Sequence, residues 1–222
     1  MENGSAGLGG TTTNLSKAAA GGLIRPSVRE IAVGSAVGAV GAGIYLFAFP
    51  AGAISTLMHA VLRLPGPGAG IAMVVGPFLV LAAMSSFFLT GARGTALIAS
   101  VAFGICHAFI IRLLHLPTNP KAGSSAAFLA ALVVFGLCLE AVMAAGRPRG
   151  RARRCLLAGT LSNAALLVFY WFAIFPQTTG WVRWRDVPLL AAVCLAAGFV
   201  SGYVAGVLSR VLPGAFVTRQ GG

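Results

Sequence analysis

Six long apolar stretches, separated by short polar segments, dominate the hydrophobic pattern of this chain. Each is close to the roughly 20 residues that a helix needs to cross a bilayer, because each residue adds about 1.5 Å. We expect membrane-spanning helices over residues 31–49, 69–90, 95–114, 124–145, 154–175 and 187–212. The pattern therefore predicts an all-α integral membrane protein, a bundle of six transmembrane helices within residues 29–213.

The connections between these stretches are short, with one exception. Residues 91–94 are too few to separate the second and third spans, so we expect these to be antiparallel neighbours. The longest connection, residues 50–68, contains AISTLMHAVLRL, which has apolar residues at helical spacing but is too short to cross. It predicts an interfacial or re-entrant helix after the first span. Residues 1–28 and 214–222 are interpreted as cytoplasmic tails, the first of them disordered because Gly, Thr, Ser and Ala dominate it.

The composition agrees with a multi-pass membrane protein, and we expect its membrane to be the plasma membrane. Hydrophobic residues make up 58% of the chain and charged residues 9%, whereas a soluble domain carries roughly a quarter charged residues. The net charge of +12 could indicate nucleic acid. However, the basic residues gather at the ends of apolar stretches, without a basic stripe interleaved with aromatic residues, so the lipid bilayer is the expected partner.

The placement of Lys and Arg predicts that both termini are cytoplasmic. With this N-in/C-in orientation, eleven basic residues lie inside and five outside, counted along the sequence. Five of the eleven lie between the fourth and fifth spans: Arg147, Arg149, Arg151, Arg153 and Arg154. Because cytoplasmic connections carry the excess of Lys and Arg, this segment dominates the orientation.

Small residues form stripes on the first and sixth spans. On the first they recur at intervals of four, which aligns them on a helix and lets another backbone approach closely: Ala32, Gly34, Ala36 and Gly38. Docking of a separate membrane subunit and packing within the bundle both require such a stripe. On the sixth span, Gly198, Gly202 and Gly206 favour packing within the bundle.

Glu140 is the one carboxylate inside a long apolar stretch. A charge in hydrocarbon is costly, so an intramembrane acid is a candidate functional residue. Glu140 could hold a cationic ligand, pair with Arg93 or another inner arginine, or be protonated and hydrogen-bonded. With the predicted orientation it lies near the cytoplasmic end of its span.

A polar and aromatic stripe on the fifth span is the best candidate for a pocket wall. Asn163 and Tyr170 share one side of the helix, with Trp171 adjacent and Trp181 and Trp184 in the following outer segment. A polar group bound midway beneath aromatic side chains would suit such a wall. An ordinary interfacial aromatic belt is the alternative.

Two features of the second and third spans could also shape a pocket. His107 lies toward the outer end of the third span and could hydrogen-bond either a ligand or a neighbouring helix. Pro77, after Gly76, lacks an amide hydrogen, and we expect it to kink the second span and free the carbonyl of Met73.

No catalytic set is recognisable in the sequence. It lacks paired carboxylates and a defensible Ser-His-Asp arrangement, and GPGAG at residues 66–70 lacks the lysine of a phosphate-binding loop. The four cysteines form no CxxC pair and the three histidines lack the spacing of metal ligands. We therefore expect no enzymatic activity, no cofactor and no metal.

The run LPGPGAGIAMVVGPFLVLAAMSSFFLTGARGTALIASVAFGI resembles the second and third helices of the substrate-binding S components of energy-coupling factor (ECF) transporters. The thiamine or hydroxymethylpyrimidine permease type is most similar, with a Gly-x-x-x-Glu pattern matched by Gly136 and Glu140 and a basic loop after it. The resemblance spans roughly residues 30–212. It implies a subunit that binds a vitamin or precursor from outside and associates with a membrane scaffold and two cytoplasmic ATPases. It also implies that Ala32 and Ala36 meet the scaffold and that residues 50–68 form a gate.

Three other functions fit parts of the pattern. A structural or regulatory membrane subunit without a small ligand explains the small-residue stripes equally well. An intramembrane enzyme acting on lipid would have to rely on Glu140 and nearby arginines, although a single acid seldom makes an active site. A transporter acting alone would need an inverted repeat or more ionisable groups than the spans contain.

Overall fold

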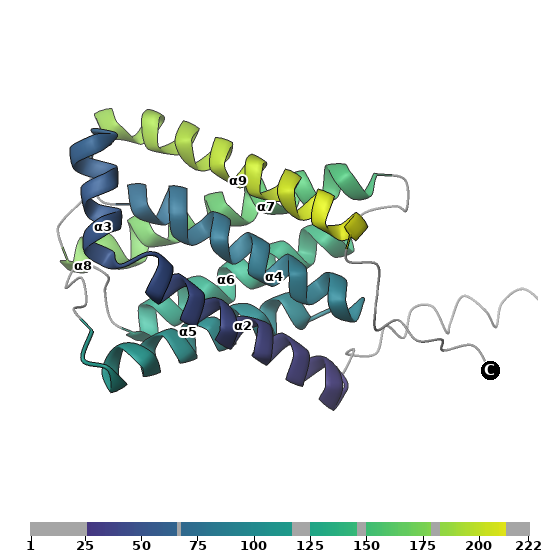
Figure 1. The fold of residues 1–222 in the computed structure, drawn as a ribbon. Helices are drawn as coiled ribbons and strands as arrows, with labels where there is room; N and C mark the ends of the chain where they lie inside the picture. The colour runs from purple at the N-terminus through teal and green to yellow at the C-terminus, as the bar shows by residue number, and fades with distance from the viewer. Residues whose placement is uncertain (1–25, 66–67, 117–124, 146–149, 179–182, 212–222) are drawn as a thin grey trace, which may run out of the picture.

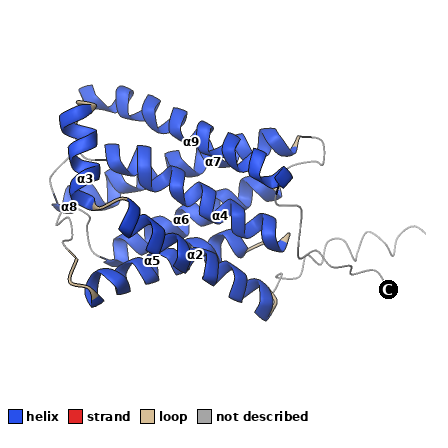
Figure 2. Ribbon diagram, in the orientation of Figure 1, coloured by secondary structure: helices blue, strands red, loops and turns tan. Residues whose placement is uncertain are grey.

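The computed structural model describes residues 26–65, 68–116, 125–145, 150–178 and 183–211. Every regular element in these ranges is a helix (Figure 2). Residues 1–25 and 212–222, which include most of the expected tails, lie outside the described part of the chain.

Six helices are long and apolar enough to cross a membrane, which confirms the six predicted spans. The first is α2 (Val28–Ala48), and the second is a π-helical turn, η2 (Ile71–Val75), that continues as α4 (Gly76–Thr90). The third and fourth are α5 (Thr95–Leu113) and α6 (Ser125–Ala144). The fifth is α7 (Arg151–Phe169) with η4 (Tyr170–Ile174), and the sixth is η5 (Trp184–Asp186) with α9 (Val187–Val211).

The bundle has α4 near its centre. Helix α2 packs against α4 and α5, α9 packs against α4 and α7, and α6 lies between α5 and α7 (Figure 1). The start of α2 and the end of α9 lie at the same end of the bundle. This agrees with an even number of crossings, while the assignment of that end to the cytoplasm stays a prediction.

A short helical segment covers the opposite end, which is the outer end in the predicted orientation. Helix α3 (Ala51–Ser55) and the turn η1 (Thr56–Val61) lie across the ends of the spans (Figure 1), and α8 (Phe175–Thr178) lies at the same end. Met58 of η1 is only 2% exposed and anchors the segment on the bundle. This confirms the expected non-crossing helix after the first span.

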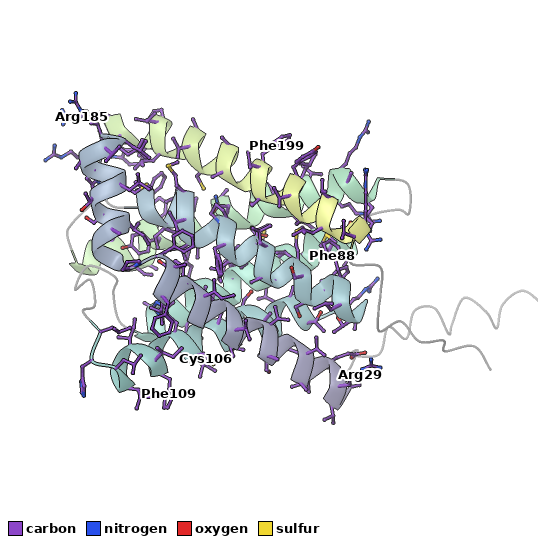
Figure 3. The ribbon with its side chains drawn as sticks, in the orientation of Figure 1. Arg29, Phe88, Cys106, Phe109, Arg185 and Phe199 are labelled. Carbon is purple, nitrogen blue, oxygen red and sulfur yellow. The ribbon has the colours of Figure 1, made fainter. Side chains whose placement is uncertain are left out.

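The sides of the bundle are apolar, as a lipid-facing surface requires. Phe109 of α5 and Phe199 of α9 are more than half exposed and point away from the neighbouring helices (Figure 3). In a soluble protein so many exposed large apolar side chains would promote aggregation, whereas acyl chains solvate them in a bilayer.

Local hydrogen bonds fix the start of α2 and the turn between α4 and α5, which the apolar pattern does not specify. Ser27 and Glu30 form a capping box at the start of α2, with Glu30 Oε2 accepting from the Ser27 amide at 2.7 Å. This places the start of the first helix at Val28, three residues before the predicted start. At the α4–α5 turn, Ser86 Oγ donates to the Thr95 carbonyl at 3.1 Å and Thr90 Oγ1 donates to Thr95 Oγ1 at 3.0 Å.

The glycine stripe of α9 packs within the bundle, as predicted. A Cβ on Gly198 would meet the Gly159 carbonyl of α7 at 2.8 Å, and one on Gly202 would overlap the Cys155 carbonyl. The α7 and α9 backbones therefore approach more closely than side chains would allow. The fifth span also begins earlier than expected: Arg151 and Arg153 lie on α7 rather than in the connection before it.

Candidate substrate-binding site

The Glu140 carboxylate binds the beginning of α5. Its Oε1 accepts a hydrogen bond from the Ala96 amide at 2.8 Å, and Ala96 lies in the first turn of α5. Gly94, the N-cap residue of that helix, has no side chain with which to cap it. Glu140 therefore supplies the missing cap from a neighbouring helix, where a negative charge also suits the helix dipole.

The ion pair between Glu140 and an inner arginine, one of the alternatives for Glu140, is not formed among the described residues. Among the described residues, no arginine nitrogen lies within 4.0 Å of its carboxylate. Arg93 is exposed, and Arg154 donates from Nη1 to the Met143 carbonyl at 3.3 Å. These contacts show that Glu140 accepts a hydrogen bond from the protein backbone, whereas its protonation and any contact with a ligand stay predictions.

Asn163 is fully buried between three spans. Its Nδ2 donates to the Ala72 carbonyl of η2 at 2.9 Å and to the Cys194 carbonyl of α9 at 2.8 Å. Its Oδ1 has no hydrogen-bond partner within the described residues and lies against Gly76, where an added Cβ would overlap it. Asn163 thus faces backbone from two helices rather than an open cavity.

The carbonyl one residue before the expected one, that of Ala72, receives its hydrogen bond from another span. In the π-helical turn the Gly76 amide donates to the Ile71 carbonyl, one residue earlier than in an α-helix. The donor that would reach Ala72 in the same register is residue 77, a proline without an amide hydrogen. Asn163 replaces this donor.

His107 belongs to an aromatic cluster drawn from four helices. Its ring stacks on Phe103 with centroids 5.9 Å apart, and it contacts Phe128 of α6 at 5.3 Å and Tyr45 of α2 at 5.9 Å. Phe78 of α4 joins the cluster through Tyr45 and Phe103. His107 and Trp171 are therefore parts of different groups of contacts, although both lie in the outer half of the bundle.

Tyr170 and Trp171 are both buried at the outer end of the fifth span. Trp171 is 8% exposed, and its indole Nε1 is a buried donor without an acceptor in the described part of the chain. Gly68, with φ +109°, packs against this nitrogen, so that an added Cβ there would lie 3.1 Å from Nε1. Tyr170 contacts Phe175 with centroids 6.3 Å apart. An unpaired buried donor is costly and marks a place where a ligand acceptor would be favourable.

The remaining aromatic candidates do not share this environment. Trp184 is 78% exposed at the start of the sixth span, as expected for a residue of the interfacial belt. Trp181 lies outside the described residues. Within the described residues no three His, Cys, Asp or Glu side chains are grouped as metal ligands.

The small residues of α2 face two different ways. Gly34 and Gly38 are buried against α5, and a Cβ on Gly38 would overlap the Ala99 carbonyl. Ala32 and Ala36 are exposed on the side of the bundle. Ala36 lines an apolar groove of about 350 Å³ between α2 and α4, together with Val40, Phe78 and other residues. Of these four small residues, Ala32 and Ala36 are the two that lie on the surface of the bundle.

The features around Gly68 and Ala72 were not predicted as parts of a site. Positive φ at Gly68 has a weak sequence signal, since glycine follows Pro67 there. The hydrogen bond from Asn163 to Ala72 has no sequence signal, because the two residues are 91 positions apart.

Comparison with known proteins gives one informative match. No family model matches the sequence, and no curated protein matches it. Among solved structures, the fold is similar to that described as "Crystal structure of an S-component of ECF transporter", with a TM-score of 0.59 and 20% sequence identity. The match covers 85% of this chain and 84% of that chain. The protein therefore has the fold of an ECF S component, a helical bundle of a multi-pass membrane protein.

Proposed function

We propose that this protein is the substrate-binding membrane subunit of an ECF-type importer. It captures a vitamin or vitamin precursor at the outer end of the bundle and delivers it together with a membrane scaffold subunit and two cytoplasmic ATPases. The observation that carries the proposal is the match in fold to an S component over 85% of the chain. The same fold can serve other functions, so the binding site needs its own support.

Trp171 is the centre of the proposed binding site. Its buried, unpaired N–H offers one hydrogen bond to an acceptor on a ligand, and the neighbouring Tyr170 adds aromatic surface. Thiamine and hydroxymethylpyrimidine are the favoured ligands, because both carry a flat ring with acceptor nitrogens. Thiamine also carries a cationic ring, which an indole face attracts. His107 would line the opposite side of the outer half.

The proposed scaffold contact is the exposed side of α2. Ala32 and Ala36 have small side chains, and Ala36 lies in the apolar groove against α4. A helix of the scaffold can approach the α2 backbone closely at such a surface.

Ligand binding to the purified protein tests the proposal. Titration of thiamine and hydroxymethylpyrimidine, followed by calorimetry, is expected to give saturable binding to at least one of them. Trp171→Phe is expected to weaken binding roughly tenfold, because an aromatic ring remains, although a smaller one, while the N–H donor is lost. The matched control is Phe172→Leu, since Phe172 is the next residue and is 60% exposed. Absence of saturable binding by both compounds and by a panel of other vitamins would exclude the function.

A membrane subunit without a small ligand is the second candidate. It is favoured by the fact that Glu140 and Asn163, the two most polar candidates within the spans, both serve backbone groups of the protein. Co-purification with scaffold and ATPase chains, combined with failure of every vitamin to bind, would support it.

A further inference from the structure

The second span is broken near its outer end. The π-helical turn Ile71–Val75 and Pro77 together leave the Ala72 carbonyl without a donor from its own helix. On the outer side of the break, the segment Gly68–Val75 is itself helical: the Ala72 amide donates to the Gly68 carbonyl at 2.8 Å. The break therefore separates a short outer segment from the regular helix α4.

Asn163 bridges this break from another span. Both hydrogens of its Nδ2 are used, one by Ala72 and one by Cys194, while its Oδ1 accepts nothing among the described residues. The Asn163 side chain therefore acts as a hydrogen-bond donor to two backbone carbonyls. It joins the outer segment to α7 and α9 at a position where the second span lacks its own hydrogen bond.

The outer segment covers the interior of the bundle. Ala69 and Ala72 are fully buried, and η2 packs against both α7 and α9. At its first residue the segment lies directly on Trp171, through Gly68. Movement of Gly68–Val75 away from the bundle would uncover Trp171 and the region around Cys194.

We propose that Gly68–Val75 is a hinged segment that pivots at Gly76–Pro77, and that Asn163 is the positioning residue that keeps it closed over Trp171. Glycine and a missing amide make the pivot the weakest point of the span. Opening exchanges the hydrogen bond from Asn163 to Ala72 for contacts with water. Entry of a ligand by this route rests on the proposed function, whereas the hinge itself does not.

The native thiol of Cys194 reports on opening without any ligand. Cys194 is 1% exposed, and its own carbonyl is an acceptor of Asn163. In full-length protein with Cys106, Cys138 and Cys155 replaced by alanine, the probe is a water-soluble cationic methanethiosulfonate, and modification is followed by mass spectrometry. We expect slow labelling in this background and roughly tenfold faster labelling after Asn163→Leu, as loss of about one net hydrogen bond predicts. Ser162→Ala, at the adjacent buried position of α7, is the matched control and is expected to leave the rate unchanged.

A second substitution separates the hinge from general loosening. Pro77→Ala restores an amide that can reach the Ala72 carbonyl, so the effect of Asn163→Leu should shrink to about threefold or less in the double variant. An equal acceleration with and without Pro77→Ala would overturn the proposal, as would an unchanged rate in Asn163→Leu.

Hydrogen exchange on the unaltered protein covers the case in which Asn163→Leu fails to fold. The amides of residues 71–75 are expected to exchange at least tenfold faster than those of residues 79–88 in the regular part of α4. Equal protection of the two segments would also overturn the hinge. Because neither measurement uses a vitamin, failure of ligand binding and failure of the hinge are separate results.

Discussion

Replacement of Glu140 distinguishes a structural carboxylate from a ligand-binding one. Glu140→Leu leaves the Ala96 amide of α5 unsatisfied in a part-buried place, at a helix start where Gly94 provides no cap. An unsatisfied buried amide costs about 1–3 kcal/mol, and loss of a favourable charge at the helix start adds about 0.3–1 kcal/mol. We therefore expect Glu140→Leu to lower the free energy of unfolding by about 1–4 kcal/mol.

Glu140→Gln should have a smaller effect. The amide oxygen still accepts from Ala96, but the bond is no longer assisted by charge and is about half as strong. We expect a loss of about 1 kcal/mol. The order of the two variants, with Leu worse than Gln, is a consequence of the hydrogen bond and not of the charge alone.

Equilibrium unfolding in mixed micelles of increasing dodecyl sulfate fraction, followed by circular dichroism, measures both losses. Glu30 provides the matched control, because it also accepts a backbone amide at a helix start, from Ser27 at 2.7 Å, but in an exposed position. Glu30→Gln is expected to cost less than about 1 kcal/mol, since water can replace the lost interaction. If Glu140→Leu is as stable as the unaltered protein and has lost ligand binding, the assignment of Glu140 to the cap of α5 is wrong.

Three further predictions concern packing, docking and orientation. Gly38→Val is expected to lower stability in the same assay by more than about 2 kcal/mol, because its side chain meets the Ala99 carbonyl, whereas Gly43→Val, with open space at its Cβ, should cost less than about 1 kcal/mol. Ala36→Trp is expected to abolish co-purification with a scaffold subunit and to leave vitamin binding intact; Ala196→Trp, at an exposed position on α9, should do neither. A single cysteine at Arg93 should react with an impermeant maleimide only from the cytoplasmic side; labelling from outside would reverse the orientation.

The hydrophobic pattern predicts the six spans well, because a membrane helix is specified mainly by its own length and composition. The cover after the first span was also predictable, since its apolar spacing is helical and its length is insufficient to cross. Ends of helices depend on single side chains. Ser27 and Glu30 move the start of the first span, and Arg151 begins the fifth earlier than its charge suggested.

The polar contacts within the spans could not be predicted to the same degree. Glu140 and Asn163 were recognisable as residues in need of partners, but each partner is a backbone group far away in sequence, 44 and 91 positions respectively. A backbone carbonyl has no sequence signal unless its own helix is broken. Pro77 gives that signal, but the π-helical turn before it, which decides that Asn163 reaches the carbonyl of Ala72, has no sequence signal of its own.

The turn between α4 and α5 bears on how the protein is made. Gly91 and Gly94 adopt positive φ angles of 68° and 89°, and hydroxyl groups on both sides of the turn bind one another across it. These bonds involve only neighbouring parts of the chain, so they do not require the later helices. The two spans can thus leave the translocation channel together as a helical hairpin, before the later helices with which they pack have emerged from the ribosome.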